Sequence, residues 1–570
     1  MNEIGAEEGG VRTRQPDREL RAPHALVLAA ATGVMLGFSF PPSTLGILAC
    51  VGLVPLLRVI GTRQRLGPVL WYTYIAMLVF HIITLNWTGG YQHGNDPYMM
   101  VAGGVTMLVH PLFYFLPVAG YHLVRTRLGA AAGLLALPML WVGYEFTHSL
   151  SEWSFPWLTL GNSQSYDIMA IQFIRWTGVY GLSLWILILN IIALLLVNRV
   201  AEGRWTFRSR PALLTALIWA TLFFLPRIEG ALALSSSAPV PAIPERTYAI
   251  GMVQPNLDPW EKWSVNGERT LQLYQHLTDS MVALDRCNGI DLILWPETAI
   301  PFYLLANTPN EQQVKLQRWI DSLGIPLLSG LPHAVVYADS ASAPPSAKRN
   351  LRTGMRYDSF NAAALFQPGV REAPWYGKMK MVPFAERVPY ADLFHFVGFL
   401  QWGVGIGGWQ IGPDTTVFTD RQTGARFSTL ICYESTYPGF VAEFVKRGAQ
   451  MLSIVTVDSW WGTMSGAYQH QRFAIFRAIE NRRWIARCAL GGISSFVDPY
   501  GRVREETDLL EPAVVCGRVQ LLNELTLYTR YGDWLGEACL WLGLAFVAGA
   551  LGKTYLHKRR ELAWQQHTST

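Results

Sequence analysis

The stretch STLICYESTYPG, residues 428–439, places a cysteine directly after an apolar β-rich run. Two earlier stretches follow the same design, LILWPETAIP at 292–301 and YGKMKMVPFAERVPY at 376–390. Open α/β sheets present their functional groups where strands end. We therefore predict that the reactive side chains of the three stretches lie together in one α/β domain; they are Glu297, Lys378 and Cys432.

The residues around these stretches have the pattern of an α/β domain from about 244 to 525. Short β-rich apolar runs, such as 248–253 and 451–457, alternate with amphipathic helical stretches, such as 266–286 and 466–482. The preceding segment, 235–244, is rich in Ser, Ala and Pro, which is typical of a domain linker.

The three residue types form a nucleophilic set. A cysteine attacks as its thiolate, so a carboxylate that accepts the proton and an ammonium that favours the anion would activate Cys432. Lys378 and the backbone N–H of Tyr433 could also stabilise a tetrahedral oxyanion. Each residue alone has an ordinary alternative role, since a strand-end cysteine is often a small buried apolar residue.

Outside this region the chain is typical of a membrane protein. Its mean hydropathy is positive, 15% of its residues are charged, and it contains 22 tryptophans, a residue enriched at membrane interfaces. A transmembrane helix needs about 20 mostly apolar residues. Eight candidates satisfy this, seven within 22–234 and one after the α/β domain: 24–41, 44–60, 68–88, 98–124, 129–147, 176–198, 211–229 and 533–553.

The charges predict the orientation of these helices. Arginines and lysines lie in the tail 1–21, after the second, fourth and sixth helices, and in the tail 554–570. The loops 41–45, 86–98 and 148–157 contain no Lys or Arg. By the positive-inside rule both tails are cytoplasmic, and residues 244–525 lie on the opposite side of the membrane.

Composition also argues against some partners. The net charge of +5 forms no long basic run, so nucleic acid is not expected as a partner. The six cysteines have neither CxxC spacing nor the density of a disulfide scaffold, and they imply no zinc site.

In their order, WPETA, YGKMKMVPFAE and CYES resemble the Glu, Lys and Cys segments of the nitrilase superfamily. Their position between seven helices and one last helix resembles the apolipoprotein N-acyltransferase family. FPWLTLGNSQ at 155–164, GVYGLS at 178–183 and MVQPNLDPWEKW at 252–263 also resemble that family. The resemblance implies an αββα sandwich outside the bacterial inner membrane, on its periplasmic side.

The resemblance further implies a ping-pong acyl transfer without cofactor or metal. Cys432 would take an acyl group from a phospholipid as a thioester and pass it to the α-amine of a diacylglyceryl-cysteine on an apolipoprotein. Glu297 would be the base and Lys378 the oxyanion stabiliser. By the same resemblance Glu386 matches a second functional glutamate of the family, and Trp263 matches its substrate-loop tryptophan. Tyr433 and Glu434 match the residues beside its cysteine. Glu386 and Glu434 could equally supply supporting hydrogen bonds around the site.

Three residues depart from the family pattern. Val457 stands where an Asn is usual, Leu490 replaces an Asn before Gly-Ile-Ser, and Ala385 replaces the Gly of FGE. None removes the proposed triad, but all three bear on the choice of substrate.

Two other functions remain open from the residues alone. A membrane-tethered amidase or carbamoylase would use the same triad on a small amide. A catalytically silent scaffold or transporter is the second alternative, although the predicted spans hold few ionisable residues.

The charge pattern makes the first testable prediction. A reporter enzyme that is active only outside the cytoplasm should be active when fused near residue 300, and inactive when fused after residue 560. Activity of a cytoplasmic reporter at residue 300 would contradict this orientation.

Overall fold

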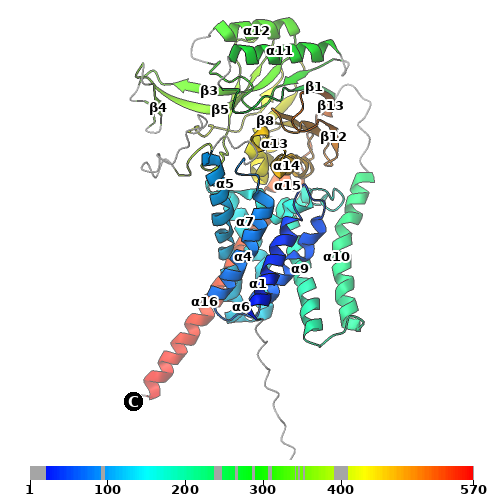
Figure 1. Cartoon of the computed structure of the whole chain (residues 1–570), viewed down its shortest axis with the longest axis vertical. Helices are drawn as coiled ribbons and strands as arrows, with labels where there is room; N and C mark the ends of the chain where they lie inside the picture. The colour runs from blue at the N-terminus through cyan, green and yellow to red at the C-terminus, as the bar shows by residue number, and fades with distance from the viewer. Residues whose placement is uncertain are drawn as a thin grey trace, which may run out of the picture.

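The computed structural model describes residues 21–90, 97–235, 247–263, 267–284, 289–305, 311–339, 342–344, 347–350, 353–390 and 408–568. A long helical bundle carries an α/β domain at one end (Figure 1). The predicted tail 1–21 and linker 235–244 lie almost wholly outside the described residues.

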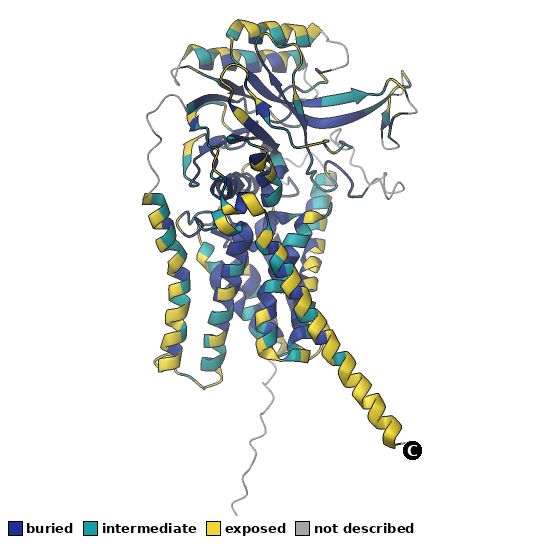
Figure 2. Ribbon diagram, turned by 180° about the vertical axis from the view of Figure 1, so that it is seen from behind, coloured by how far each residue is buried: buried dark blue, intermediate teal, exposed yellow. Residues whose placement is uncertain are grey.

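Long apolar helices make up most of the bundle. Within the described residues, six helical segments are long and apolar enough to cross a membrane. They are α4 (Leu66–Leu85), α5 to α6 (Met99–Leu128), α7 (Ala130–Leu150), α9 (Val179–Ala201), α10 (Arg210–Ser235) and α16 (Trp534–Thr568). Large apolar residues on α10, including Leu213, Leu217 and Leu232, are exposed, as suits a lipid-facing surface. The ribbon coloured by burial shows much of this helix as exposed (Figure 2).

The first two predicted helices are shorter than expected. The first, α1 (Ala22–Gly37), has 16 residues, and the second divides into η1 (Gly46–Leu48), α2 (Ala49–Gly52) and α3 (Val54–Ile60). Pro55 lies in the first turn of α3, where a proline is tolerated but cannot continue a preceding helix. The prediction of eight full-length spans therefore holds for six helices in the described chain, with two shorter apolar ones beside them.

The fourth predicted helix is also interrupted. It consists of α5 (Pro97–Val109), the 3₁₀ segment η2 (His110–Tyr114) and α6 (Phe115–Leu128). Pro111 removes one backbone donor, which favours the tighter 3₁₀ turn at this point. Gly129, with φ of 104°, then lets the chain reverse directly into α7.

The segment between α7 and α9 packs into the end of the bundle near the α/β domain. It contains η3 (Pro156–Leu158), η4 (Leu160–Gln164) and α8 (Ile174–Thr177), and most of its residues are buried. The carboxylate of Glu145 accepts hydrogen bonds from Trp141 Nε1 and Leu160 N, at 3.1 and 2.8 Å. This segment therefore lies between the helical bundle and the α/β domain.

Two stacked sheets form the α/β domain. One sheet has the order β13-β1-β2-β3-β5-β4, with β6 paired to β5, and the other has the order β12-β11-β10-β9-β8-β7. The first sheet comprises β1 (Thr247–Gln254), β2 (Leu292–Leu294), β3 (Leu327–Val336), β4 (Lys348–Arg349), β5 (Arg356–Phe366), β6 (Trp375–Gly377) and β13 (Ala513–Gln520). The second comprises β7 (Phe418–Thr419), β8 (Arg426–Ile431), β9 (Met451–Thr456), β10 (Ile485–Ala489), β11 (Ser495–Val497) and β12 (Val503–Glu506).

Helices cover both outer faces of this pair of sheets (Figure 1). The helices α11 (Gly267–Ala283) and α12 (Glu311–Leu323) lie on the side away from the bundle. The helices α13 (Pro438–Lys446), α14 (Ser465–Asn481) and α15 (Leu527–Tyr531) lie between the sheets and the bundle. The αββα sandwich and the helical bundle confirm the predicted fold class.

The side chain of Gln469, on α14, joins the domain to the bundle. Its Oε1 accepts hydrogen bonds from the indole N–H groups of Trp87 and Trp157, at 3.0 and 2.7 Å. Its Nε2 donates to the carbonyl oxygens of Pro41 and Thr84, at 2.9 and 3.0 Å. The buried amide thus uses both lone pairs and both hydrogens, and all four partners belong to the membrane half.

Replacing Gln469 by Leu should destabilise the junction of the two halves. The substitution leaves two indole donors and two carbonyl acceptors without their partner, and each buried unsatisfied group costs about 1–3 kcal/mol. We expect a clearly lower thermal unfolding temperature in detergent, while Gln272→Leu on the exposed face of α11 should change it little. Equal unfolding temperatures for the two variants would show that this amide does not hold the halves together.

Candidate active site

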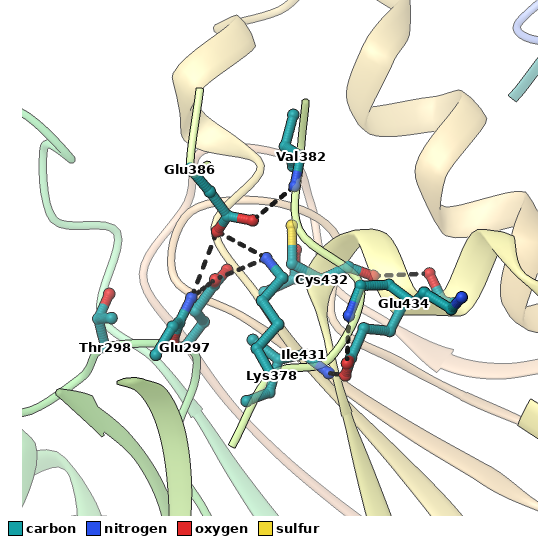
Figure 3. Close-up of polar contacts among 12 residues, drawn as sticks. Glu297, Thr298, Lys378, Val382, Glu386, Ile431, Cys432 and Glu434 are labelled. Atoms are coloured by element: carbon teal, nitrogen blue, oxygen red, sulfur yellow. Dashed lines mark hydrogen bonds and ion pairs between the residues drawn. The ribbon is translucent and has the colours of Figure 1, made fainter. Parts of the chain in front are cut away.

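The three predicted residues lie at strand ends and converge on one place (Figure 3). Glu297 follows β2, Lys378 directly follows β6, and Cys432 begins η7 (Cys432–Thr436) immediately after β8. Because β2 and β6 belong to one sheet and β8 to the other, the site lies where the two sheets meet.

Lys378 is fully buried between two carboxylates. Its Nζ lies 2.7 Å from Glu386 Oε1 and 3.5 Å from Glu297 Oε1. Burial alone would lower the pKa of Lys378, but Glu386 and Glu297 outweigh it and raise this pKa above its usual value. The two carboxylates therefore favour the charged form of Lys378.

Hydrogen bonds from Val382 and Asn361 hold the carboxylates of Glu386 and Glu297 in position. Glu386 Oε2 accepts a hydrogen bond from Val382 N at 2.8 Å, which closes the turn after Lys378. The amide of Asn361 donates to Glu297 Oε1 at 2.7 Å and to Glu386 Oε1 at 3.4 Å. Asn361, on β5, was not singled out from the sequence.

Cys432 adopts a conformation that is unusual for its residue type. Its φ is 53°, in the left-handed region, where a residue with a side chain is strained. Such a turn directly after a strand lifts the side chain out of the sheet, as in other nucleophile turns. Burial and then Glu297 raise the pKa of the Cys432 thiol, whereas Lys378 lowers it. A raised pKa favours the protonated thiol, so attack as a thiolate requires a base.

Glu434 links the cysteine turn to the lysine segment. Its Oε2 accepts from Ile431 N at 2.7 Å, and its Oε1 accepts from Tyr376 Oη at 2.6 Å and from Met379 N at 2.7 Å. Burial raises the pKa of Glu434 despite these bonds. Through these hydrogen bonds, Glu434 supports the backbone turns on either side of the Cys432 thiol.

Tyr433 connects the same turn to the membrane half. Its hydroxyl donates to Ser154 O at 2.9 Å, and its ring stacks near Phe155 and Trp157. Tyr437, four residues later, forms a 2.6 Å hydrogen bond with Ser154 Oγ.

Trp263 lies outside the charged cluster. It is 37% exposed, and the Nζ of Lys262 lies 5.4 Å from the centre of the Trp263 ring. Its exposure suits contact with a substrate better than support of the triad.

Lys262 itself is a buried residue that sequence reasoning missed. Its Nζ donates a short hydrogen bond to Thr298 Oγ1, directly after Glu297. Burial lowers the pKa of Lys262 to about 8, against the opposing effect of Glu297. Lys262 adjoins Trp263 in the stretch MVQPNLDPWEKW, but nothing in the pattern of this stretch indicates that the lysine is buried.

No group of three or more His, Cys, Asp or Glu side chains within the described ranges could hold a metal ion. The arrangement instead provides a thiol, a nearby carboxylate and a fixed ammonium. These are the parts needed for acyl transfer through a covalent cysteine intermediate.

Comparison with known proteins matches both halves of the chain. The model of the apolipoprotein N-acyltransferase N-terminal domain matches residues 32–192, and that of the carbon-nitrogen hydrolases matches residues 249–523. An apolipoprotein N-acyltransferase of Chlorobaculum tepidum is 35% identical over 535 residues, which cover 91% of this chain and 96% of that protein. One of Geobacter metallireducens is 29% identical over 548 residues, covering 94% and 97%.

These matches extend over both the helical bundle and the αββα domain and confirm the resemblance found in the motifs. The chain is a multi-pass membrane protein that belongs to the apolipoprotein N-acyltransferase family.

Proposed function

We propose that the chain transfers a fatty acyl group from a phospholipid to the α-amine of the diacylglyceryl-cysteine of an apolipoprotein. This proposal is supported by the clustering of the partly exposed Cys432 with the buried Glu297 and Lys378 in a domain that lies at one end of a bundle of apolar helices. Both proposed substrates are anchored in the bilayer, so a reactive thiol fixed to a membrane bundle can reach them.

In the first half-reaction Glu297 accepts the proton of the Cys432 thiol. The thiolate attacks the ester carbonyl carbon of the phospholipid, and Lys378 and the Tyr433 N–H stabilise the tetrahedral oxyanion. Collapse breaks the ester C–O bond, and Glu297 returns the proton to the departing alkoxide of the lysophospholipid. A thioester on Cys432 remains.

The second half-reaction runs the same steps with an amine. The neutral α-amine attacks the thioester carbonyl, and Lys378 again faces the oxyanion. Glu297 accepts a proton from the attacking nitrogen, the C–S bond breaks, and this proton returns to the Cys432 sulfur. The products are an amide and the free enzyme. Glu297 thus serves as base and then as acid in each half-reaction.

We further propose that the αββα domain faces the periplasm from the inner membrane. The arginine and lysine pattern supports this orientation. A second support is that Cys516, on β13 of this domain, is disulfide-bonded, because disulfides persist in oxidising compartments.

Cys432 should be the acylated residue. Cys432→Ala and Cys432→Ser should accumulate no acyl-enzyme with phospholipid, by mass spectrometry of the intact protein. The matched control is Cys488→Ala, because Cys488 is a buried free cysteine on β10. This control should acylate normally, and an adduct that persists in Cys432→Ala would overturn the assignment.

Glu297 and Lys378 should fail differently when replaced. Glu297→Gln removes the proton acceptor, so acylation should be slow near pH 7 and recover as the pH rises and the thiol ionises unaided. Lys378→Met removes the oxyanion stabiliser, a loss of about 10² to 10³ in rate, and higher pH should not restore it.

A pH series of single-turnover thioester formation measures both effects, after folding of each variant is verified. Identical pH responses of the two variants, or a normal rate for Lys378→Met, would refute this division of roles.

A further inference from the structure

A buried histidine contacts the backbone of the nucleophile. His470, on α14 and next to Gln469, has its Nε2 3.1 Å from the carbonyl oxygen of Cys432 and 3.1 Å from Ser435 Oγ. Its Nδ1 lies 2.8 Å from Asp458 Oδ1. His470 and Asp458 are both fully buried.

The His470 ring has an acceptor on each side, and one donor, Arg487 Nη2, which lies farther from Nδ1, at 3.2 Å, than the Asp458 carboxylate, at 2.8 Å. The Cys432 carbonyl and the Asp458 carboxylate can only accept. Ser435 already donates its hydroxyl hydrogen to the Cys432 carbonyl, at 2.9 Å, so its oxygen is an acceptor for His470 as well. A neutral imidazole has one N–H, and its other nitrogen would then point a lone pair at an acceptor oxygen. An imidazolium, with two N–H groups, satisfies both sides.

Arg487 fixes the carboxylate of this network. Its Nη2 donates to Asp458 Oδ2 at 2.6 Å and lies 3.2 Å from His470 Nδ1. Burial would raise the pKa of Asp458, but the charges of Arg487 and His470 hold it below its usual range. Asp458 is thus an anion that one guanidinium and the histidine share.

Aromatic rings surround the imidazole and favour its charged form. Trp157, from the membrane half, stacks on His470 with ring centres 5.4 Å apart and planes at 30°. Trp461 and Phe473 approach from other sides. A cation over the face of a tryptophan within about 6 Å is stabilised by the ring quadrupole.

We propose that His470 is a positioning residue that acts as a buried imidazolium: it donates a hydrogen bond to the carbonyl oxygen of Cys432, holds that residue in its left-handed conformation, and favours the thiolate. This charge offsets the neighbouring anions. Glu297, Glu386 and Asp458 each disfavour the thiolate electrostatically, and Lys378 opposes them.

The test measures the thiol directly. Purified full-length protein in detergent, without phospholipid, is treated with iodoacetamide, and alkylation of Cys432 is followed by peptide mass spectrometry from pH 5.5 to 11. His470→Gln keeps a neutral donor near the position of Nε2, and His470→Asn keeps one near Nδ1. We expect both variants to alkylate about tenfold more slowly at pH 7 and to recover at high pH, as for a thiol pKa raised by about one unit. His276→Gln, on the exposed face of α11, should match the wild type.

Two outcomes would overturn the proposal. One is a His470→Gln profile that superimposes on the wild type, because a neutral donor would then suffice. The other is a uniform loss at every pH, because a structural defect would then explain the effect.

If neither variant folds, NMR spectra of the wild-type protein labelled with ¹⁵N-histidine, recorded at pH 8, test the proposal instead. The proposal expects an imidazolium signal that shifts when Cys432 is alkylated, and the absence of such a signal contradicts it. The inference rests on Cys432 being the nucleophile, but alkylation requires no acyl donor. A failure here is therefore distinguishable from a failure of the proposed acyl transfer.

Discussion

The four hydrogen bonds of the Gln469 amide are the constraint on which the arrangement of the two halves depends. They attach α14 to Trp87, Trp157 and two backbone carbonyls of the membrane half. Further along the same helix, Glu480 accepts a hydrogen bond from Val179 N at the start of α9, while pairing with Arg477. Together with the hydrogen bonds of Tyr433 and Tyr437 to Ser154, this helix positions the nucleophile relative to the bundle.

The charged groups buried around the Cys432 thiol provide the chemistry of the site, and their burial costs free energy. Lys378 has no exposed surface and lies against two carboxylates, and removing ions from water is expensive unless their partners are close and well oriented. Asn361, Val382 and the turn at Glu386 supply that orientation through hydrogen bonds. The strained φ of Cys432 is maintained in the same way, by Glu434 on one side and His470 on the other. A rigid, preorganised site of this kind stabilises charge as it develops in a transition state.

The sequence predicted those parts of the structure that depend on local pattern. Glu297, Lys378 and Cys432 were found because each follows an apolar run at a strand end, and the long helices were found from their apolar length. Contacts between distant segments could not be read in this way. Asn361 is 64 residues from Glu297 in the chain, and the burial of Lys262 depends on how its loop folds over Thr298. The packing of η3 and η4 into the bundle likewise depends on polar side chains, such as that of Glu145, which carry no periodic signal.

Transfer from an isolated acyl-enzyme is the most direct test of the central claim, that Cys432 passes an acyl group between two membrane-anchored substrates. The protein is acylated with phospholipid, freed of excess lipid, and mixed with a diacylglyceryl-cysteine peptide that has a free α-amine. We expect that the acyl mass leaves Cys432 and appears as an amide on the peptide, and that an N-acetylated peptide receives none. Release of free fatty acid without transfer to the amine would contradict the account and indicate a hydrolase.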